Sequence, residues 1–387
     1  MNNLQDDEWD FADIKRVSLG LREARRYRLR RGDLLFNRTN SKELVGKCGV
    51  FNERGVWVFA SYLIRVCTDA EKLLPQFAAF FINSPAGRIQ IDRVSRQIIG
   101  MTNVNAEELR ELAIPLPPMA KQRELVDVME TARSARRAKL AEADALLAGM
   151  DAYLLETLGL ALPAADDRRS FALTLGTLRE QSRLGPYYFH PERVLAIHAM
   201  EAVSSRMACA KLSDAVAFVR DQIKTPDENY IGLAGVQSQT GELSGADEEA
   251  EGACFTFQRG DVLFARLRPY LNKVWLADSS GCCSPEFHVL RVINEKALQP
   301  EYLAAVLRSS LVLSQTRHMM TGNTHPRLAN EDVVNLVVPV PDAKIQQSIA
   351  AEIRRRRERA RVLRAEAEAG WAEARLWFEE QLLGPTP

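Results

Sequence analysis

The most constraining feature of this sequence is a motif that occurs twice. Residues 31–38 read RGDLLFNR and residues 259–266 read RGDVLFAR, at an offset of 228 residues. Two further matches keep the same order; they are Pro75–Ala79 with Pro300–Ala304, and Ile114–Pro117 with Val338–Pro341. A period of this length is far too long for a solenoid repeat and indicates duplicated domains. The chain is therefore expected to contain two copies of one module.

The first copy is expected to be short at its N-terminus. Residues 1–31 precede its Gly-Asp turn, whereas residues 171–252 of the second copy, with a plausible strand pair at 230–233 and 236–237, have no full counterpart upstream. Asp13–Val17 is interpreted as a remnant of that region. Two explanations stay open, a misplaced gene start and a truncated natural variant.

Length and composition indicate an ordinary soluble protein of two or three domains. The chain has 387 residues, with 46% hydrophobic and 26% charged residues. Without a long apolar run or a signal peptide, it is expected to be cytoplasmic, and its six cysteines, which form no C-x-x-C pair, to be reduced thiols. The net charge of zero counts mildly against a simple nucleic-acid binder, but the distribution of charge over the surface decides.

Local patterns predict a mixed α+β domain in each copy. Short apolar strands are expected at Leu34–Phe36 and Val262–Phe264, each entered by a Gly-Asp turn in which glycine supplies a positive φ. Further elements are expected as strands at 56–59 and 287–292 and as amphipathic helices at 74–83 and 301–309.

A long helix is predicted after each Pro-x-Pro exit. Met119–Leu158 contains no proline and a single glycine, and Ala343–Leu383 is broken only by Gly370. At 1.5 Å per residue each helix would be roughly 60 Å long. The predicted boundaries are residues 1–117 for the first domain, 118–160 for the first helix, 161–341 for the second domain and 342–387 for the second helix.

Apolar residues at a 3/4 spacing predict that the two helices pack antiparallel on each other as a coiled coil. In the first helix the seam residues are Leu125, Met129, Ala132, Ala143, Leu146, Met150 and Tyr153. In the second helix they are Ile349, Ile353, Ala360, Leu363, Ala367, Ala374 and Trp377. The alternative is two independent surface helices.

The stretch at 31–47, RGDLLFNRTNSKELVGK, resembles the DNA-specificity subunit of type I restriction–modification systems, as does PLPPMAKQ at 115–122 before the long helix. The resemblance covers nearly the whole chain, although 339–342 match more weakly. It implies an α+β fold in which two target-recognition domains are separated by two long helices packed as an antiparallel coiled coil. It also implies a non-catalytic subunit that reads a bipartite DNA target, with the helix pair as a ruler between the half-sites.

The same resemblance implies the partners. These are double-stranded DNA, two methyltransferase (modification) subunits that carry S-adenosylmethionine and modify adenine N6, and, indirectly, the restriction/translocase subunits. No cofactor or metal ion is expected on this chain, and no membrane contact.

Motifs for chemistry of its own are missing from the sequence. It has no Asn/Asp-Pro-Pro-Tyr/Phe motif to hold a flipped adenine and no G-x-G-x-x-G to open a βαβ unit. Two alternatives to the restriction–modification reading stay open. One is the DNA-reading subunit of another phage-defence system, and the other is a protein scaffold that binds no DNA, which the neutral net charge supports.

Residues that could contact DNA combine cations for phosphates with planar amide or guanidinium groups for base edges. In the first copy they are Arg25, Arg26, Asn37, Arg38, Thr39, Asn40, Lys42, Lys47, Gln97, Thr102 and Asn103. In the second copy they are Arg266, Arg268, Tyr270, Asn272, Lys273, Asn323, Thr324, His325 and Arg327. Positions shared by both copies, such as Arg38 and Arg266, have an alternative role in folding the turn without reaching DNA.

Overall fold

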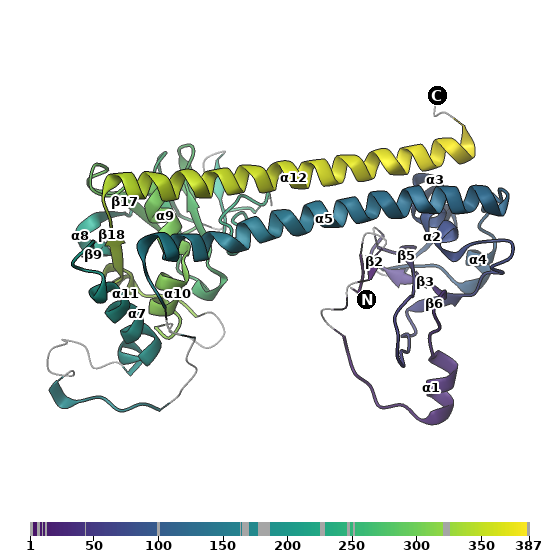
Figure 1. The fold of residues 1–387 in the computed structure, drawn as a ribbon, viewed down its shortest axis with the longest axis horizontal. Coiled ribbons are helices and arrows are strands. Elements are labelled where there is room, and N and C mark those ends of the chain that lie inside the picture. The colour runs from purple at the N-terminus through teal and green to yellow at the C-terminus, as the bar shows by residue number, and fades with distance from the viewer. Residues whose placement is uncertain are drawn as a thin grey trace. The chain divides into compact units, whose positions relative to one another are not determined.

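The two copies of the repeated motif fall in separate units of the structure, a computed structural model of the chain (Figure 1). The first unit comprises residues 1–141 and 363–387, and the second comprises residues 142–362. Each long helix contributes one part to each unit. The residues that the structure describes are 3–5, 8–9, 11, 14–42, 44–98, 101–162, 164, 170–176, 186–224, 229–245, 248–250, 252–319 and 326–384.

The first domain is built on small antiparallel sheets covered by helix α2. Its elements are β1 (Leu4–Gln5), β2 (Glu8–Trp9), α1 (Leu21–Tyr27), β3 (Leu34–Asn37), β4 (Thr39–Asn40), β5 (Cys48–Val50), β6 (Leu63–Val66), α2 (Pro75–Asn83), α3 (Pro85–Val94), β7 (Arg96–Ile98), β8 (Met101–Asn103), α4 (Ala106–Arg110) and α5 (Met119–Leu158). The strand orders are β5-β3-β6, β4-β8-β7 and β1-β2. The core lies between β3 and α2, where Leu34, Phe36 and Ala78 are fully buried.

The second domain repeats this plan with more strands. Its elements are η1 (Pro186–Phe189), α7 (Pro191–Ala202), β9 (Ala208–Lys211), α8 (Leu212–Ala215), β10 (Val216–Val219), β11 (Gln222–Ile223), β12 (Tyr230–Ile231), β13 (Cys254–Phe257), β14 (Val262–Ala265), η2 (Pro269–Leu271), β15 (Val274–Leu276), β16 (Gly281–Cys283), β17 (Phe287–Val292), α9 (Pro300–Arg308), α10 (Ser310–Thr316), α11 (Asn330–Val334), β18 (Val337–Val340) and α12 (Ala343–Leu383). The strand orders are β10-β17-β14-β15, β11-β13-β16-β12 and β18-β9.

The Gly-Asp motif forms the same turn in both domains. Gly32 and Gly260 have φ values of +89° and +91°, a region that glycine adopts without strain. The next residue, Asp33 or Asp261, is buried and accepts a hydrogen bond from the backbone N–H three residues before it, at 2.8 Å and 2.9 Å. The predicted positive φ of the glycine is confirmed, and the aspartate closes the turn by bonding nearby backbone.

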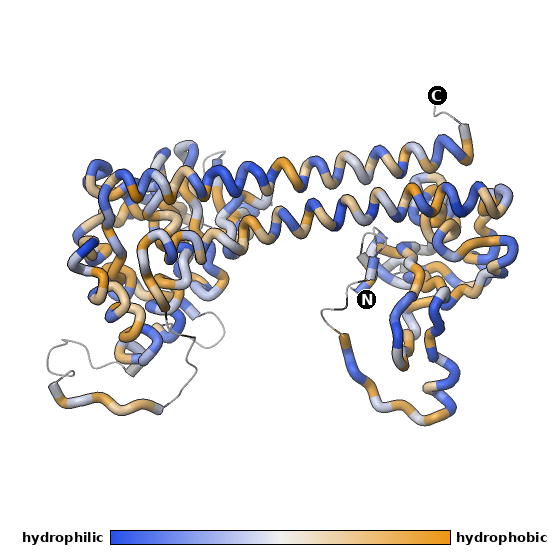
Figure 2. The backbone as a smooth tube through the Cα atoms, viewed as in Figure 1, coloured by the Kyte–Doolittle hydropathy of each residue, from blue (hydrophilic) through white to orange (hydrophobic). Residues whose placement is uncertain are grey.

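The long helices occupy Met119–Leu158 and Ala343–Leu383, as predicted, and they pack antiparallel within each unit. In the first unit, Arg136 of α5 donates to Glu368 of α12 at 2.9 Å. In the second unit, Arg356 donates to the carbonyl of Gly149 at 2.7 Å. A second contact within each unit, Lys121 with Gln381 at 3.1 Å in the first and Glu142 with Arg359 at 3.6 Å in the second, shows that the residue number rises on one helix as it falls on the other. Figure 2 shows hydrophobic residues alternating with hydrophilic ones along both helices.

Each long helix is joined to its own domain by one glutamine near its start, Gln122 in α5 and Gln346 in α12, through the same set of hydrogen bonds. The Gln122 side chain accepts from the Leu74 N–H at 2.9 Å and donates to the carbonyls of Lys72 and Pro117. Gln346 accepts from the Gln299 N–H at 2.9 Å and donates to the carbonyls of Ala297 and Pro341. The repeated Pro-x-Pro exit and its glutamine therefore anchor the helix to the domain.

The packing seam differs in detail from the prediction. On α5 the buried residues are Leu147 and Leu154 in place of Leu146 and Tyr153, and on α12 Phe378 is more deeply buried than Trp377. A straight α-helix drifts away from a strict 3.5-residue repeat. The predicted spacing therefore fails at single positions, as between the buried Ala143 and Met150, and Trp371 also enters the core of the first domain.

The α+β class and the duplicated plan are confirmed, whereas some predicted strands are not. Residues 56–59 hold only a single bridge, from Val58 to Arg28, and β6 was not predicted. Tyr230–Ile231 pairs with β16 rather than with residues 236–237. Within Asp13–Val17, residues 14–17 form no strand, and Asp13 lies outside the described residues.

All six cysteines are free thiols, as expected from their spacing. None of the helices in the described ranges carries an apolar stretch of membrane-spanning length.

Candidate nucleic-acid interface

The shared arginines, Arg38 and Arg266, have their backbones held in equivalent positions at the end of β3 and β14. Arg38 donates its N–H to Tyr62 O at 3.0 Å and accepts from the Val104 N–H at 2.9 Å. Arg266 donates to Glu286 O and accepts from the Leu328 N–H, both at 2.9 Å. These hydrogen bonds fix the backbone of each arginine, and so they fix the position from which its side chain extends.

The Nε donors of both arginines are buried and have no hydrogen-bond partner among the described residues. Neither guanidinium forms an ion pair within the described ranges, although both side chains are only half-buried. A buried donor without an acceptor costs about 1–3 kcal/mol. Both copies carry this cost at the same atom.

His288 lies beside Arg266 and adds a second unpartnered donor or acceptor. Its Nε2 atom is buried without a partner in the described part of the chain, and its ring contacts Phe218 edge-on with centroids 6.1 Å apart. Burial, reinforced by the Arg266 and Arg220 charges, lowers the pKa of His288 to about 4. The imidazole is therefore neutral at pH 7. Sequence reasoning missed both His288 and Arg220, because neither stands in a recognisable motif.

Helix α1 presents the predicted arginines to solvent. Arg25 and Arg26 lie in its last turn, and the helix buries none of its side chains. The Arg26 guanidinium lies 5.5 Å from the centroid of the Tyr27 ring. Neither arginine forms an ion pair with another described residue. Lys42 is exposed as well, so these three predicted contacts are accessible to a ligand.

The other predicted polar residues around Arg38 form internal hydrogen bonds or are buried, and they hold the loop in place. Asn37 is 1% exposed and donates to Leu44 O at 3.3 Å. Thr39 donates to the Asn103 side chain at 3.0 Å, across the β4–β8 pair, and Asn40 accepts from the Ser41 N–H. Thr102 is buried in the same pair. We therefore assign these five residues to positioning the loop.

The predicted residues of the second domain also fall into two groups, those with internal contacts and those exposed to solvent. Asn272 is buried and donates to Gln239 and to Arg308 O, at 3.1 Å and 2.6 Å. Lys273 donates to Leu233 O at 2.6 Å, and desolvation lowers its pKa. Arg327 makes a bidentate contact with Glu286. Among the predicted residues of this domain that the structure describes, Arg268 and Tyr270 alone are exposed; Arg268 has a φ of +48° and precedes the turn η2, in which Tyr270 lies.

Some predicted contacts cannot be placed. Asn323, Thr324 and His325 lie outside the described residues, and for Gln97 only the backbone of β7 is described.

Lys47 lines a cavity of about 640 Å³ in the first domain, together with Arg88, Arg136 and Arg375. Arg136 and Arg375 already donate to Glu368 and to Asn83 O there.

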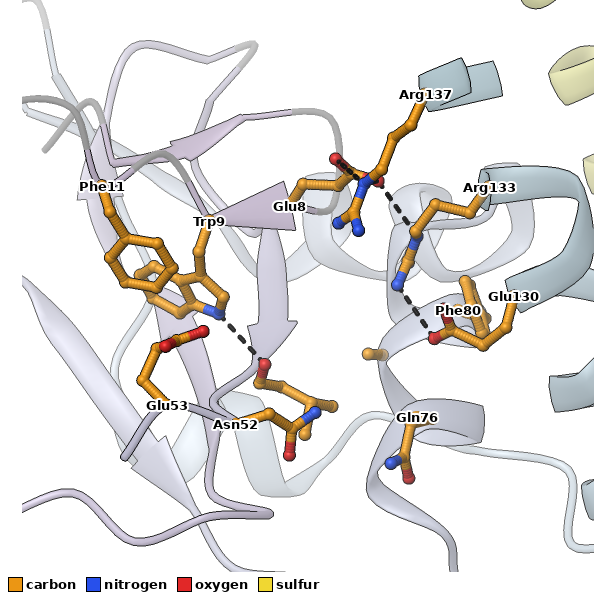
Figure 3. Close-up of a pocket in the computed structure, with 12 residues that line it drawn as sticks. Glu8, Trp9, Phe11, Asn52, Glu53, Gln76, Phe80, Glu130, Arg133 and Arg137 are labelled. Carbon is orange, nitrogen blue, oxygen red and sulfur yellow. Dashed lines mark hydrogen bonds and ion pairs between the residues drawn. The ribbon is translucent and has the colours of Figure 1, made fainter. Parts of the chain in front are cut away.

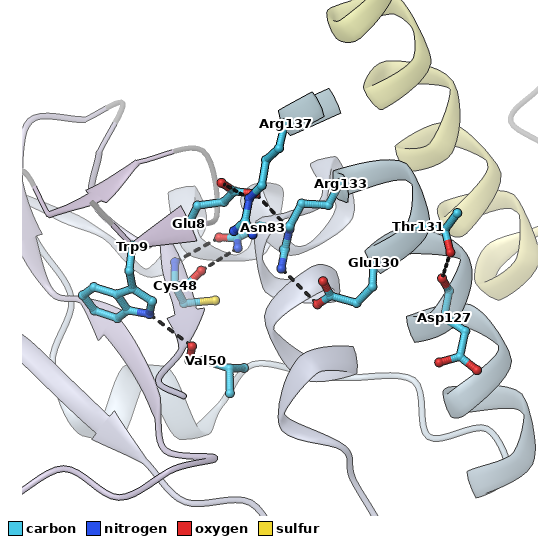
Figure 4. Close-up of polar contacts among 10 residues, drawn as sticks. All are labelled: Glu8, Trp9, Cys48, Val50, Asn83, Asp127, Glu130, Thr131, Arg133 and Arg137. Atoms are coloured by element: carbon cyan, nitrogen blue, oxygen red, sulfur yellow. Dashed lines mark hydrogen bonds and ion pairs between the residues drawn. The ribbon is translucent and has the colours of Figure 1, made fainter. Parts of the chain in front are cut away.

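A second cavity of about 240 Å³ lies between the β1–β2 hairpin and helix α5 (Figure 3). Its lining mixes acids with bases, and Glu8 accepts from Arg137 at 2.6 Å while Arg133 donates to Glu130 at 3.0 Å. Arg133 also lies 4.5 Å from the Phe80 ring centroid. Figure 4 shows these ion pairs. The α5 arginines here are thus engaged in holding the hairpin and are not free for an anion.

Three residues with metal-binding side chains meet where the start of α7 lies beside the end of α10; His190 and Glu192 are neighbours in the sequence, whereas His318 is 126 positions beyond Glu192. The ligand atoms of His190, Glu192 and His318 lie within 4.8 Å of one another. The two imidazole rings stack face to face with centroids 3.4 Å apart, so their nitrogen lone pairs run side by side instead of converging. His318 contacts Glu192 at 3.0 Å. The cluster acts as a packing contact that joins the two helices.

Comparison with known proteins places this architecture in a class of two-copy DNA specificity proteins. The sequence model of the type I restriction modification DNA specificity domain matches residues 2–141 and 229–355, one stretch on each copy. These stretches together make up more than half of the chain. The chain belongs to this family.

Individual relatives match over shorter stretches. The type I restriction enzyme EcoKI specificity subunit of Escherichia coli (strain K12) is 29% identical over 124 residues, which cover 31% of this chain and 26% of the relative. The StySPI specificity subunit of Salmonella potsdam is 27% identical over 130 residues, which cover 31% of this chain and 28% of the relative. The matched part thus spans just over a quarter of these curated relatives.

The fold has a counterpart among solved structures. A chain from a structure that describes complex assembly and conformational transition of a type I restriction–modification system aligns with a TM-score of 0.50 and 16% identity. The alignment covers 93% of this chain and 83% of that chain. At this identity the likeness concerns the fold alone.

Proposed function

We propose that this chain is the non-catalytic, sequence-specific DNA-binding subunit of a type I restriction–modification complex. Each domain would read one half of a bipartite target, and the paired long helices would set the spacer between the halves. Family membership over both copies carries the proposal, because a duplicated reader suits a target with two halves.

The guanidinium groups of Arg38 and Arg266, which are only half-buried and form no ion pair with another described residue, support DNA contact at equivalent places in the two domains. Arginine is well suited to phosphate and to guanine, because its planar fork offers several donors. In each domain we assign DNA contact to the exposed residues among those predicted; these are Arg25, Arg26 and Lys42 in the first domain and Arg268 and Tyr270 in the second. Residues that differ between the copies would provide two different half-site sequences.

The long helices would dock the partners. The proposed partners are two methyltransferase subunits that bind S-adenosylmethionine and methylate adenine, and through them the restriction/translocase subunits. Apolar side chains that stay exposed on the helices support such docking; Leu376 on α12 is 57% exposed and Val128 on α5 is 39% exposed. In this arrangement the chain would act in the cytoplasm.

A titration of the purified chain with duplex DNA at several salt concentrations tests the proposal. If six or more phosphates are contacted, affinity should fall about a thousandfold or more between 50 and 200 mM salt. Binding that is absent, or that is insensitive to salt, would favour a protein scaffold instead. Methyl transfer by the chain alone, measured with a labelled donor, would contradict a non-catalytic role.

A further inference from the structure

Residues 237–242 of the second domain form a closed loop beside the turn η2. Gln239, in the middle of the loop, is exposed, and its backbone N–H donates to Leu271 O of η2 at 3.3 Å. The exposed Arg268 and Tyr270, to which DNA contact is assigned above, lie just before this turn and within it. Gln239 therefore lies next to the candidate interface, although it stands in no recognisable motif.

Three residues with a left-handed backbone meet at this place. Apart from glycines, the residues with positive φ in the described ranges are Gln239, Arg268 and Asn272, at +65°, +48° and +52°. The Gln239 N–H also donates to Asn272 O at 3.3 Å, and Arg268 O accepts from the Leu271 N–H at 2.8 Å. This conformation costs energy for a residue with a side chain, so it persists only where the surrounding structure holds it, and such residues cluster at functional sites. The loop and the turn are thus held in one fixed shape.

Two amide side chains determine which group Gln239 presents to a ligand. Asn272 is 5% exposed, and its Nδ2 atom lies 2.6 Å from Arg308 O. A backbone carbonyl only accepts, so the Asn272 atom that faces it must be the nitrogen. The second hydrogen of this nitrogen is donated to Oε1 of Gln239, at 3.1 Å. The NH2 group of Gln239 is on the other branch of its amide, and it donates to no residue that the structure describes.

We propose that Gln239 reads a base of the half-site that the second domain binds, through this NH2 group. Base reading by Gln239 rests on the proposed function. In the major groove, guanine O6 and thymine O4 accept hydrogen bonds, whereas adenine N6 and cytosine N4 donate them. Because Asn272 holds Oε1, the group that meets the base is a donor. Gln239 therefore selects guanine or thymine at one position, and Asn272 is a positioning residue that fixes the orientation of the amide.

Gln239→Glu separates base reading from a structural role. Glutamate has nearly the same shape, and its carboxylate still accepts the bond from Asn272, so the loop is kept. The group that meets the base changes from a donor to an acceptor. The preferred base should therefore change from guanine or thymine to adenine or cytosine, at one position of one half-site. A glutamine that served only to accept from Asn272 would leave the specificity unchanged.

The experiment is long-read sequencing for methylated adenines in the native host, deleted for this gene and complemented with the unsubstituted chain or a variant. Gln239→Glu should alter one position of one half-site and leave the other half-site intact. Gln258→Glu is the matched control, because Gln258 is an exposed glutamine that precedes strand β14, whereas η2 follows this strand. The Gln258→Glu variant should methylate the original motif.

Binding by the purified chain measures the size of the effect. On two duplexes that differ only at the altered base pair, Gln239→Glu should lose its preference for the original duplex by about tenfold or more. Gln239→Gly should bind the two duplexes with nearly equal affinity. Its melting temperature should stay close to that of the unsubstituted chain, because glycine adopts a positive φ without strain.

The outcomes separate this proposal from the proposed function. If the unsubstituted chain directs no methylation, the proposed function fails. If it directs a bipartite motif that both Gln239 variants keep unchanged, base reading by Gln239 alone is overturned. If Gln239→Glu directs no methylation, a Gln239→Gly motif relaxed at one position supports base reading. Loss of all methylation with both variants would show a structural role and would also overturn the proposal.

Discussion

Arg291 donates two hydrogen bonds of 2.8 Å to the carboxylate of Asp261, the aspartate of the second Gly-Asp turn. In the first domain the position of Arg291 is taken by Cys67, whose thiol lies 3.5 Å from an Asp33 oxygen, and the ion pair with Asp33 comes from Arg65, at 4.0 Å. Both aspartates keep the bond from the backbone N–H three residues before them. The duplicated turn is thus conserved within the chain, while the ion pair that supports it is tight in one copy and loose in the other.

Replacing the arginine should therefore affect the two domains unequally. Arg291→Ala leaves the fully buried Asp261 carboxylate with fewer donors, and we expect a loss of about 1–3 kcal/mol in the stability of the second domain. Arg65→Ala should cost less than about 1 kcal/mol. Hydrogen exchange of the β14 and β3 amides measures both, and equal losses would contradict this view of the turn.

The glutamine anchors give a matched pair of substitutions. Gln122→Ala and Gln346→Ala each remove three hydrogen bonds between a long helix and its domain. Each change leaves buried backbone groups unpaired, so a loss of about 2–3 kcal/mol is expected in urea unfolding. Gln381→Ala on the exposed part of α12 is the control and should change stability little. A small effect at either anchor would mean that the Pro-x-Pro exit holds the helix without it.

His288 should make the second domain sensitive to acid. Its folded-state pKa of about 4 lies below the ordinary value of 6.5, so the unfolded chain binds a proton over this interval and the folded domain does not. This contribution to stability is complete above pH 6.5 and is lost as the pH falls towards 4, by about 3 kcal/mol at most.

His288→Phe should remove that part of the pH dependence, because phenylalanine cannot take up a proton. Thermal melts at pH 7 and pH 5 provide the measurement, and the variant should lose less melting temperature between them than the unsubstituted chain. The first domain has Ile64 at the equivalent position and supplies an internal comparison. An identical loss in both proteins would show that His288 does not control the acid response.

The sequence predicted the elements that rest on local pattern. The Gly-Asp turns, β17, the two long helices and their antiparallel packing follow from glycine, proline and apolar spacing, which act over a few residues. The failures concern features decided by distant parts of the chain. β6 forms because β3 offers it a neighbour, and Trp371 and Phe378 enter the seam because α2 presents Phe77 and Phe80 to them.

The candidate interface was predicted only in outline. Composition identified the loop at 37–42 as polar, but could not separate Asn37, whose side chain bonds inward, from Lys42, which faces solvent. The contribution of Arg220 and His288 depends on strand β10 lying beside β17, a pairing between residues more than 60 positions apart. No sequence motif predicts a contact between strands so far apart in the chain.

The shared arginines should separate DNA binding from stability. Arg38→Ala and Arg266→Ala are each expected to weaken duplex binding about tenfold, because a charge-assisted contact is worth about 1.5–3 kcal/mol. Their melting temperatures should stay close to that of the unsubstituted chain, since neither guanidinium bonds to another described residue.

Two variants control this experiment. Asn272→Ala, which removes two internal hydrogen bonds, should lower the melting temperature of the second domain. Arg361→Ala, at an arginine paired with Glu358 on α12, should change neither property. If Arg38→Ala and Arg266→Ala lower the melting temperature but leave the DNA affinity unchanged, the two arginines have a structural role alone.

The most direct test of the central claim is long-read sequencing for methylated adenines in the native genome, with and without this gene. A specificity subunit with two reading domains predicts a methylated motif of two short sequences separated by a fixed spacer. That motif should disappear when the gene is deleted and return when it is restored. A methylation pattern unchanged by the deletion would contradict the account, as would the loss of a single continuous motif.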